Sequence, residues 1–285
     1  MNYKKHILMS LYLILLATVS CNQDTTSKTY DWDNVVDRIW VGENFWANRL
    51  QDWEIKDGQL VCIQALENKP MRTVHLLSSR LVNAGDFKVS INTGVIDTEN
   101  TLNENAASGF LIGAGASLDY RAAALIHQSP GKEGGYFVGV QTNGLLFVQD
   151  FNDPKKEILA SEMIENLPKS YQIDVSGSKG ETSYQIKVTI LDDSNKELGS
   201  IIHSIDESAV EGNVALVSHP GQGENTAAFW FDNWKISGDK FNYDATHLGG
   251  PIITAQHTLS DNILKINAQL MPIGKLDNPT VTLEI

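Results

Sequence analysis

The chain has very few cysteines, since Cys21 and Cys62 are the only two among its 285 residues. At most one intramolecular disulfide is available, which excludes the small scaffolds that depend on several disulfides. Cys62 lies in the apolar run 60–63, where a buried free thiol is the expected state. A packed core must therefore stabilise this chain.

Basic residues are also scarce. Lys and Arg total 22 against 35 Asp and Glu, which gives a formal net charge of −13 at pH 7. A nucleic-acid-binding surface requires clustered positive charge to neutralise phosphates. The composition argues against a nucleic-acid partner, while acidity by itself is a common means of keeping a protein in solution.

The first twenty residues differ from the rest of the chain. Lys4 and Lys5 precede the apolar run 7–19, whose 13 residues are fewer than the roughly 20 of a membrane-spanning helix. This layout predicts a signal peptide over residues 1–20. The junction before Cys21 is similar to a bacterial lipoprotein cleavage site. The similarity implies lipidation of Cys21 and a membrane-anchored lipoprotein of the cell envelope or cell surface; the alternative is an ordinary secretory signal with a chance cysteine.

Long helical patterns are missing from the remainder. After a polar tether over residues 21–31, no helical periodicity exceeds about ten residues, which argues against alternating βα units. Around a dozen antiparallel strands require two stacked sheets to bury their apolar faces. We therefore expect an all-β, concanavalin- or laminin-G-like jelly-roll sandwich over residues 32–238. The strand candidates are residues 53–56, 59–63, 73–77, 87–95, 108–113, 122–127, 136–142, 145–151, 171–176, 184–191, 198–203, 214–218 and 228–236.

One tight turn predicts the register of a hairpin. Asn143-Gly144 lies between two apolar runs and supplies the positive φ angles of a two-residue turn. This turn would place Val140 opposite Phe147, on a face that packs between the sheets. The opposite face, with Gln141 and Asp150, would be more hydrated.

The last strand of the expected sandwich is rich in aromatic residues. Strict alternation predicts that one set of side chains faces one side of the sheet and the other set faces the opposite side. The first set is Trp230, Asp232, Trp234 and Ile236, and the second is Phe229, Phe231, Asn233 and Lys235.

The chain changes character after Gly238. A polar linker is expected over residues 239–250, followed by a β unit over residues 251–285. Its strand candidates are 251–259, 263–270 and 280–285. This unit resembles the start of an immunoglobulin-like domain, and it lies below the roughly 40 residues that independent folding requires. It should pack on the sandwich, or the chain is incomplete.

Motifs for catalysis are missing. The seven histidines include no pair at the close spacing of a zinc site, and there is no Gly-x-Ser-x-Gly elbow, phosphate loop or dinucleotide fingerprint. No strand carries the paired carboxylates of a glycosidase. We therefore expect no metal, no cofactor and no catalytic residue.

A ligand-binding strand is the strongest remaining candidate. Alternation puts Arg121 and His127 on one side of the strand candidate 122–127, with small residues between them that leave space for a sugar. Tyr120 or Tyr136 could supply a stacking surface. The alternative is an arginine paired with a surface acid and a histidine at a strand end. The candidate ligand-binding residues are Tyr120, Arg121, His127, Tyr136, Gln141 and Asp150.

Two aromatic segments resemble a known family. Residues 44–58, NFWANRLQDWEIKDG, and residues 229–234, FWFDNW, are similar to the N-terminal lectin-like module of lipoproteins of the alkaline phosphatase D type. Residues 250–259 and 280–285 are similar to the start of the small β-domain that follows in that family. The resemblance covers nearly all of residues 40–285. It implies a metallophosphoesterase domain further along, but the Asp, Asn and His motifs of that domain are missing from this sequence, so no catalytic residue can be assigned.

Three functions remain open. The first is a lipid-anchored, non-catalytic accessory or binding module for a glycan or cell-surface ligand. The second is a sugar-active hydrolase similar to keto-disaccharide hydrolase domains through residues 86–89 and 108–111, with Asp119 or Asp150 as catalyst. The third is a purely structural envelope lipoprotein.

Overall fold

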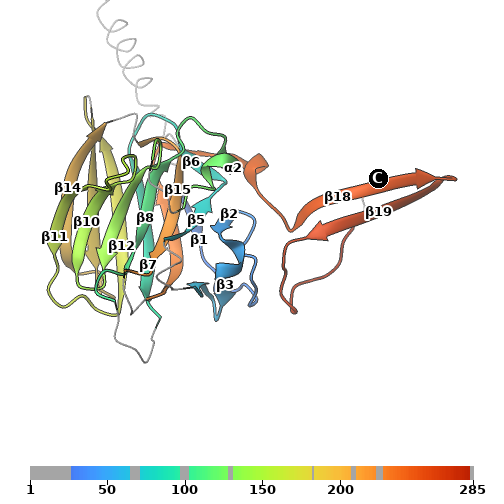
Figure 1. Ribbon diagram of the computed structural model, residues 1–285, viewed down its shortest axis with the longest axis horizontal. Coiled ribbons are helices and arrows are strands. Elements are labelled where there is room, and N and C mark those ends of the chain that lie inside the picture. Colours follow the sequence, from blue (N-terminus) through green and yellow to red (C-terminus); the bar gives the residue numbers. More distant parts are fainter. Residues whose placement is uncertain are drawn as a thin grey trace, which may run out of the picture.

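The computed structural model describes residues 27–64, 71–96, 103–127, 131–181, 183–206, 210–222 and 227–282. Within them, two antiparallel β-sheets are stacked face to face, and a long β-hairpin projects from one end of this sandwich (Figure 1). This architecture confirms the predicted all-β sandwich. The predicted signal peptide and Cys21 lie outside the described residues. In the described part, no helix has the length and hydropathy that crossing a bilayer requires.

The two sheets have eight and seven strands. The eight-stranded sheet has the order β14 (Glu197–Asp206), β13 (Ser183–Leu191), β12 (Ser170–Lys179), β7 (Phe87–Val95), β16 (Phe229–Ser237), β4 (Gln59–Cys62) and β3 (Trp53–Lys56), with β1 (Ser27–Tyr30) paired to β16. The seven-stranded sheet has the order β11 (Ile158–Met163), β10 (Leu145–Asp150), β9 (Tyr136–Gln141), β8 (Ala107–Ala114), β15 (Asn213–His219), β5 (Arg72–Leu76) and β2 (Phe45–Asn48). Both sheets thus depend on pairing between strands that are far apart in sequence.

Smaller elements surround the sandwich. Two pairs of strands form separate two-stranded sheets: β6 (Ser79–Leu81) with β17 (Phe241–Tyr243), and β18 (Ile252–Ser260) with β19 (Ile263–Leu270). The described residues also contain the short helix α2 (Tyr120–Ala123) and the 3-10 helices η1 (Leu50–Asp52) and η3 (Ala245–His247).

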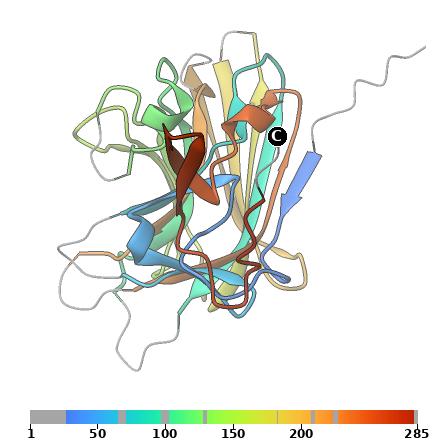
Figure 2. The ribbon, with the colours of Figure 1, turned by 90° about the vertical axis from the view of Figure 1, so that its right-hand side faces the viewer.

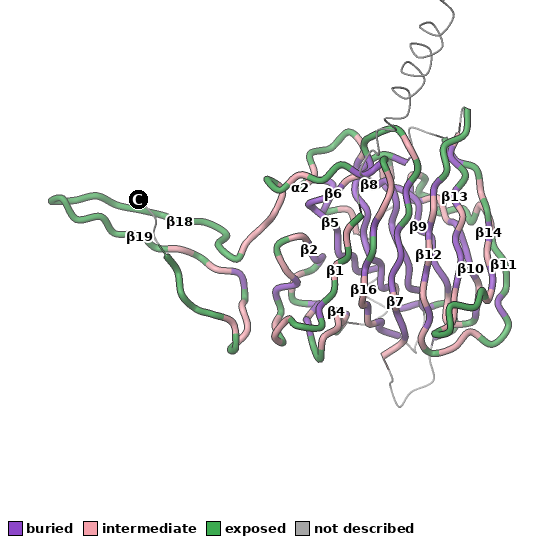
Figure 3. Tube along the Cα trace, turned by 180° about the vertical axis from the view of Figure 1, so that it is seen from behind, coloured by how far each residue is buried: buried purple, intermediate pink, exposed green. Residues whose placement is uncertain are grey.

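The core lies between the sheets, whose strands are largely buried (purple in Figure 3), and it includes many aromatic side chains. Trp234 of β16 is fully buried, and its ring stacks on Phe45 of β2 with 5.5 Å between the ring centroids. Phe110 of β8 and Tyr30 of β1 contact the same indole, at 6.0 and 6.3 Å. One tryptophan therefore contacts strands of both sheets, and burial of its large apolar surface stabilises their stacking.

A β-bulge in β16 decides which of its side chains face this core. The pairing of β16 with β7 shifts between Asp232 and Lys235, so Asn233 and Trp234 together oppose the single residue Ile91. Asn233 has a left-handed backbone conformation, with φ of 57°. An extra residue in one strand reverses the alternation of side chains beyond it.

The strict alternation predicted for β16 is therefore wrong beyond Asp232. The core-facing residues are Phe229, Phe231, Trp234 and Ile236, all of them buried. The outward residues are Trp230, Asp232, Asn233 and Lys235, which are half-buried or exposed. The bulge places every large apolar side chain of the second half of β16 in the core and leaves a polar outer face.

We predict that the bulge depends on the tolerance of Asn233 for positive φ. Asn233→Gly should keep the stability of the protein, whereas Asn233→Ala should lower the free energy of unfolding by about 1 kcal/mol, because a Cβ disfavours the left-handed conformation. Urea denaturation followed by tryptophan fluorescence measures both. An alanine variant as stable as the glycine variant would contradict this account.

The hairpin of β9 and β10 has a three-residue loop, so its predicted register is wrong by one residue. Val140 pairs with Leu146 and not with Phe147. Residues 142–144 form the loop, and the Gly144 N–H donates to the carbonyl oxygen of the last residue of β9 at 2.8 Å. Gly144 has φ of 93°, as expected for the third position of such a loop. Phe147 consequently leaves the core between the sheets and lies on the outer face.

Both predicted connecting segments are partly built into the sandwich. Residues 27–30 of the expected tether form β1, seen in blue at the periphery in Figure 2, which pairs with residues 234–237 of β16. In the expected linker 239–250, β17 pairs with β6, and Lys240 and Phe241 are buried. The polar composition of residues 239–250 predicted an exposed linker, but a lysine can be buried when its ammonium forms hydrogen bonds. The Lys240 Nζ donates to a backbone carbonyl oxygen at 3.1 Å.

The projecting hairpin consists of β18 and β19, in agreement with the strands predicted at 251–259 and 263–270. Every residue of β18 is exposed, so the hairpin itself does not pack on the sandwich. The segment after β19 does make contact with it, because Asp277 pairs with Arg38 at 2.8 Å and the Trp40 N–H donates to the Pro272 carbonyl oxygen at 3.3 Å. Residues 280–282 have no regular structure, and the rest of the predicted third strand lies outside the described residues. The described part of the predicted immunoglobulin-like unit is therefore a two-stranded sheet followed by an irregular segment that attaches it to the sandwich.

Candidate functional site

The predicted ligand-binding strand 122–127 is a loop with one helical turn. Helix α2 starts after Asp119, whose carboxylate accepts a hydrogen bond from the Arg121 N–H at 3.0 Å. An aspartate in this position favours a helix start because it satisfies a free N–H of the first turn. The alternation that would have put Arg121 and His127 on one side is therefore wrong.

The side chains of this loop bind protein groups. The ring of Tyr120 stacks on His247 with 3.7 Å between centroids. The Arg121 Nε donates to Asp119 at 2.9 Å, so the arginine pairs with a surface acid, as the alternative interpretation held. The Nδ1 atom of His127 bonds the carbonyl oxygen of Leu125 at 2.7 Å. These contacts leave no shared binding surface.

The remaining predicted residues lie on the hairpin of β9 and β10. Tyr136 and Asp150 are directly opposite each other, while Gln141 is at the far end of β9. Tyr136 is buried, and the Asp150 carboxylate accepts the N–H of Asn152 at 2.8 Å. The structure thus does not bring the six candidates together into one site.

The two acids considered as catalysts are also engaged. Hydrogen bonds from the Arg121 side chain hold the pKa of Asp119 below its usual range, so this carboxyl is a poor proton donor. Asp150 is fixed by Asn152, whose side-chain amide donates to it at 3.0 Å. Asp119 therefore lacks the raised pKa of a general acid.

The outer face of the seven-stranded sheet is apolar and closed, in contrast to the hydrated face expected there. Phe137 and Phe147 pack edge to face with 4.9 Å between ring centroids, and Phe151 adjoins them. All three are buried, and Ile126 of the α2 loop packs on their cluster. The one-residue change of register thus adds Phe147 to this face, where it packs on Phe137.

Two histidines with lowered pKa values, the buried His75 and the half-buried His219, lie on the same sheet. The Nε2 atom of His75 bonds the Ile126 carbonyl oxygen at 2.6 Å, and burial lowers the pKa of His75 to about 4. Burial also lowers the pKa of His219 to about 4. Both side chains are therefore neutral at pH 7, whereas an unfolded chain protonates its histidines near pH 6.5.

We predict a pH-dependent stability from these histidines. Between pH 6.5 and pH 4 the unfolded state binds protons that the folded state does not, so stability falls as pH falls through this range. The expected loss is about 2 kcal/mol per histidine between pH 7.5 and pH 5. Urea denaturation at the two pH values measures it. His75→Gln should remove about half of the loss, and His257→Gln, on the exposed hairpin, should not change it.

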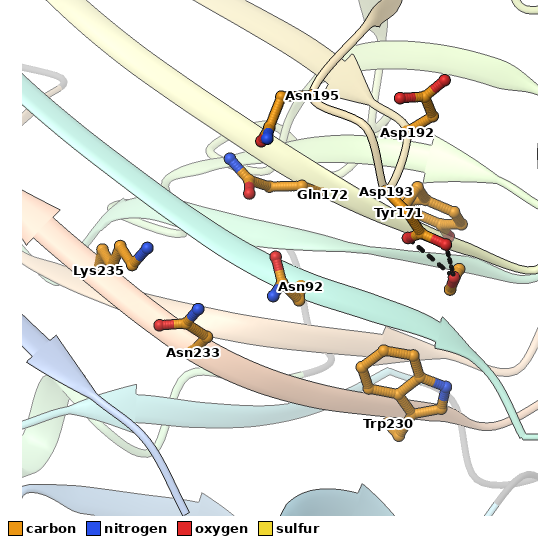
Figure 4. A pocket seen from close by; sticks show the side chains of 10 residues that line it. Asn92, Tyr171, Gln172, Asp192, Asp193, Asn195, Trp230, Asn233 and Lys235 are labelled. Carbon is orange, nitrogen blue, oxygen red and sulfur yellow. Dashed lines mark hydrogen bonds between the residues drawn. The ribbon is translucent and has the colours of Figure 1, made fainter.

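An open pocket lies on the other sheet. It has a volume of about 310 Å³ and is lined by side chains of β16, β7 and β12 and of the turn between β13 and β14 (Figure 4). Its lining residues are Asn92, Ser170, Tyr171, Gln172, Asp192, Asp193, Asn195, Trp230, Asn233 and Lys235. We call it the Trp230 pocket.

Trp230 forms an aromatic platform in this pocket. It faces outward opposite Gly94, which in turn pairs with Ser170, so the three residues form one row across β16, β7 and β12. A Cβ atom on Gly94 would lie 2.7 Å from the Trp230 Nε1 and 2.5 Å from the Lys169 carbonyl oxygen. The absence of a side chain at Gly94 therefore lets the indole lie over the neighbouring strand, and Figure 4 shows its broad face turned to the viewer.

Polar side chains lie to one side of the platform. The bulge directs Asn233 outward next to Lys235, while Asn92 and Gln172 come from the two neighbouring strands (Figure 4). In the described part of the chain, the side chains of Asn92, Asn233 and Lys235 have no hydrogen-bond or ion-pair partner in the protein. Amides that lack protein partners are free to bond a ligand as both donors and acceptors.

The turn between β13 and β14 forms one wall of the pocket. The Asp192 carboxylate accepts the backbone N–H groups of Ser194 and Lys196, each at 2.9 Å. Bonds of this kind, with the Ser194 hydroxyl foremost, lower the pKa of Asp192 and brace the turn. Asp193 accepts the Ser170 hydroxyl at 3.1 Å, which attaches the turn to β12. The described residues contain no group of acids, histidines or cysteines arranged to hold a metal ion.

No model of a protein family and no curated protein sequence matches this chain. Among solved structures it is similar to arcelin-5, a lectin-like defence protein from Phaseolus vulgaris, with 11% identity, a TM-score of 0.52 and coverage of 77% of this chain and 100% of that one. A Lotus tetragonolobus seed lectin gives 12% identity, a TM-score of 0.51, and coverage of 79% and 100%. The Emp47p carbohydrate recognition domain has 14% identity and a TM-score of 0.51, and the match covers 75% of this chain and 96% of that one.

The sandwich has a legume-lectin fold. At these identities the likeness establishes the architecture of the lectin-like sandwich, and the ligand must be inferred from its own side chains.

Sequence reasoning missed the Trp230 pocket of the lectin-like sandwich. Asn92 and Gln172 lie in strands that were predicted correctly, so their outward direction was available from alternation. Strict alternation groups Asn233 and Lys235 with the core-facing Phe229 and Phe231. This grouping is wrong because a pattern that repeats every two residues cannot include the extra residue of the bulge. The asparagine in front of a buried tryptophan is the one local signal of that bulge, since asparagine tolerates positive φ.

Proposed function

We propose that this protein is a lectin-like module that binds a glycan at the Trp230 pocket. The observation that carries the proposal is the Trp230 indole, which lies over Gly94 with its face open and with unpartnered amides around it. The similarity of the fold to lectins supports the proposal at the level of architecture.

The chemistry of the pocket suits a sugar. A sugar ring presents C–H groups on its faces and hydroxyls around its rim, so a flat indole with amides beside it complements its two kinds of surface. The amides of Asn92 and Asn233 offer donors and acceptors together, as each hydroxyl requires. Because these side chains stand on strands, little conformational entropy is lost when they bind.

A matched pair of tryptophan variants tests the proposal. Trp230→Ala should weaken glycan binding at least about tenfold, because the stacking surface is lost. Trp46→Ala is the control, since Trp46 is also half-buried but lies on the outer face of the seven-stranded sheet, opposite His75. Affinity electrophoresis in gels that contain soluble polysaccharides measures both, with circular dichroism to confirm folding. Loss of binding in the Trp46 variant alone would assign the site to the other sheet.

We propose further that the module is anchored to a membrane through Cys21, as an accessory module like the one in the lipoproteins that its sequence resembles. The signal-like residues 1–20 and the junction before Cys21 support this. Residues 22–26 alone would separate the lipid from the start of β1, and five residues span at most about 18 Å. The sandwich would then lie close to the membrane surface.

Replacement of the cysteines tests the anchor. Cys21→Ala should move the protein from the membrane fraction to the soluble fraction, because the acyl chains are attached to that residue. Cys62→Ala, which changes a buried thiol of β4, is the control and should stay with the membrane. Immunoblots of fractionated cells that find the Cys21 variant in the membrane would refute the anchor.

A further inference from the structure

We propose that the Trp230 pocket binds an internal segment of an extended, neutral polysaccharide that runs along β16 from Trp230 toward Lys235. This inference rests on the proposed function and adds the class of glycan and its mode of binding.

The shape of the pocket favours an extended chain over a single sugar. Trp230 and Lys235 are the two ends of its lining on β16, and with one residue taken up by the bulge they are about 13 Å apart along the strand. This length exceeds one sugar ring. A ring stacked on Trp230 therefore covers only part of the lining, and the side chains beyond the platform are placed to contact further sugars of the same chain.

The position of the pocket favours an internal segment. The floor is the face of a sheet, made by Trp230, Asn92 and Gln172 from three adjacent strands (Figure 4). The lining residues outside the sheet all come from the turn at residues 192–195, which stands beyond β12 beside Ser170, in the same row of residues as Trp230. This wall lies to the side of β16 and leaves the direction along that strand open, whereas recognition of a chain end requires a closed end to the site.

The available groups favour a neutral polymer. The polar side chains without protein partners in the described part of the pocket include the amides of Asn92, Asn195 and Asn233, whereas Lys235 supplies the single positive charge of the lining. Asp192 and Asp193 line the wall, and the whole chain has a formal net charge of −13. A polyuronate or sulfated glycan would meet repulsion from both, because exposed charges act over about 8 Å at physiological salt.

The bulge is the feature that makes this mode possible. Without the extra residue, Asn233 would oppose Ile91 and point to the core, so the outward row of β16 would lose an amide between Trp230 and Lys235. With it, Trp230, Asp232, Asn233 and Lys235 all face outward along the strand. Core packing by Trp234 and ligand contact by Asn233 thus depend on the same irregularity.

Calorimetric titration with a length series tests the inference. The probes are a β-1,3-glucan, a β-1,4-glucan and a galactomannan, each as the polymer and as fragments of one to six sugars, with pectate and alginate as acidic polymers. For the neutral polymer that binds, affinity should rise at least about tenfold from one sugar to four as new hydrogen bonds form, and then level. Binding should be unchanged between low and high salt.

Two lysine variants locate the far end of the chain. Lys235→Ala should weaken binding of the four-sugar fragment about three- to tenfold and leave binding of one sugar unchanged, because one hydrogen bond is lost. Lys187→Ala is the control, since Lys187 is on β13 of the same sheet and outside the pocket.

The outcomes separate the inference from the proposed function. If one sugar binds as tightly as the polymer and Trp230→Ala abolishes this binding, the pocket is a monosaccharide site and only the inference fails. Tighter binding of pectate or alginate, with weakening in high salt, overturns the neutral class. If wild-type protein binds none of the polymers, or if Trp230→Ala leaves their binding unchanged, the proposed function fails together with the inference.

Discussion

The bulge at Asn233 is the constraint on which the core and the candidate site both depend. Because Asn233 adds one residue opposite Ile91, the same strand turns Trp234 into the core and keeps Trp230 on the outer face. Trp234 contacts aromatic residues of both sheets, so the stacking of the sandwich depends on this choice of face. A regular strand would present one of the two tryptophans on the wrong side.

The sequence predicts the architecture and most strands because period-two alternation is a strong signal over β7, β12 and β13. It fails where one residue is added. The hairpin loop of residues 142–144 and the bulge at Asn233 each shift the phase by one position, and each moves an aromatic side chain, Phe147 or Trp234, to the opposite face. These shifts depend on how two strands pair, and a single strand's pattern contains no information on its partner.

The candidate site could not be predicted for a related reason. The predicted residues Tyr120, Arg121 and His127 are neighbours in sequence; Arg121 and His127 bond groups of their own loop, and Tyr120 stacks on His247. The Trp230 pocket instead collects residues from β7, β12 and β16, which become adjacent only through long-range pairing. Gly94 is an example. Its missing side chain makes room for the Trp230 indole, and this can be seen only when the two strands are paired.

The two outer faces of the sandwich differ in what they leave available for a ligand. On the seven-stranded sheet, Phe137, Phe147 and Phe151 pack together under the α2 loop, so a ligand would have to displace a formed apolar cluster and lose its burial. On the eight-stranded sheet, the Trp230 pocket presents an indole, amides and Lys235 on an open strand face. A ligand there displaces water alone and meets groups already held by strands, which keeps the entropic cost of binding low. Binding at the eight-stranded sheet therefore leaves the packing of the sandwich intact, whereas binding at the other sheet would oppose it.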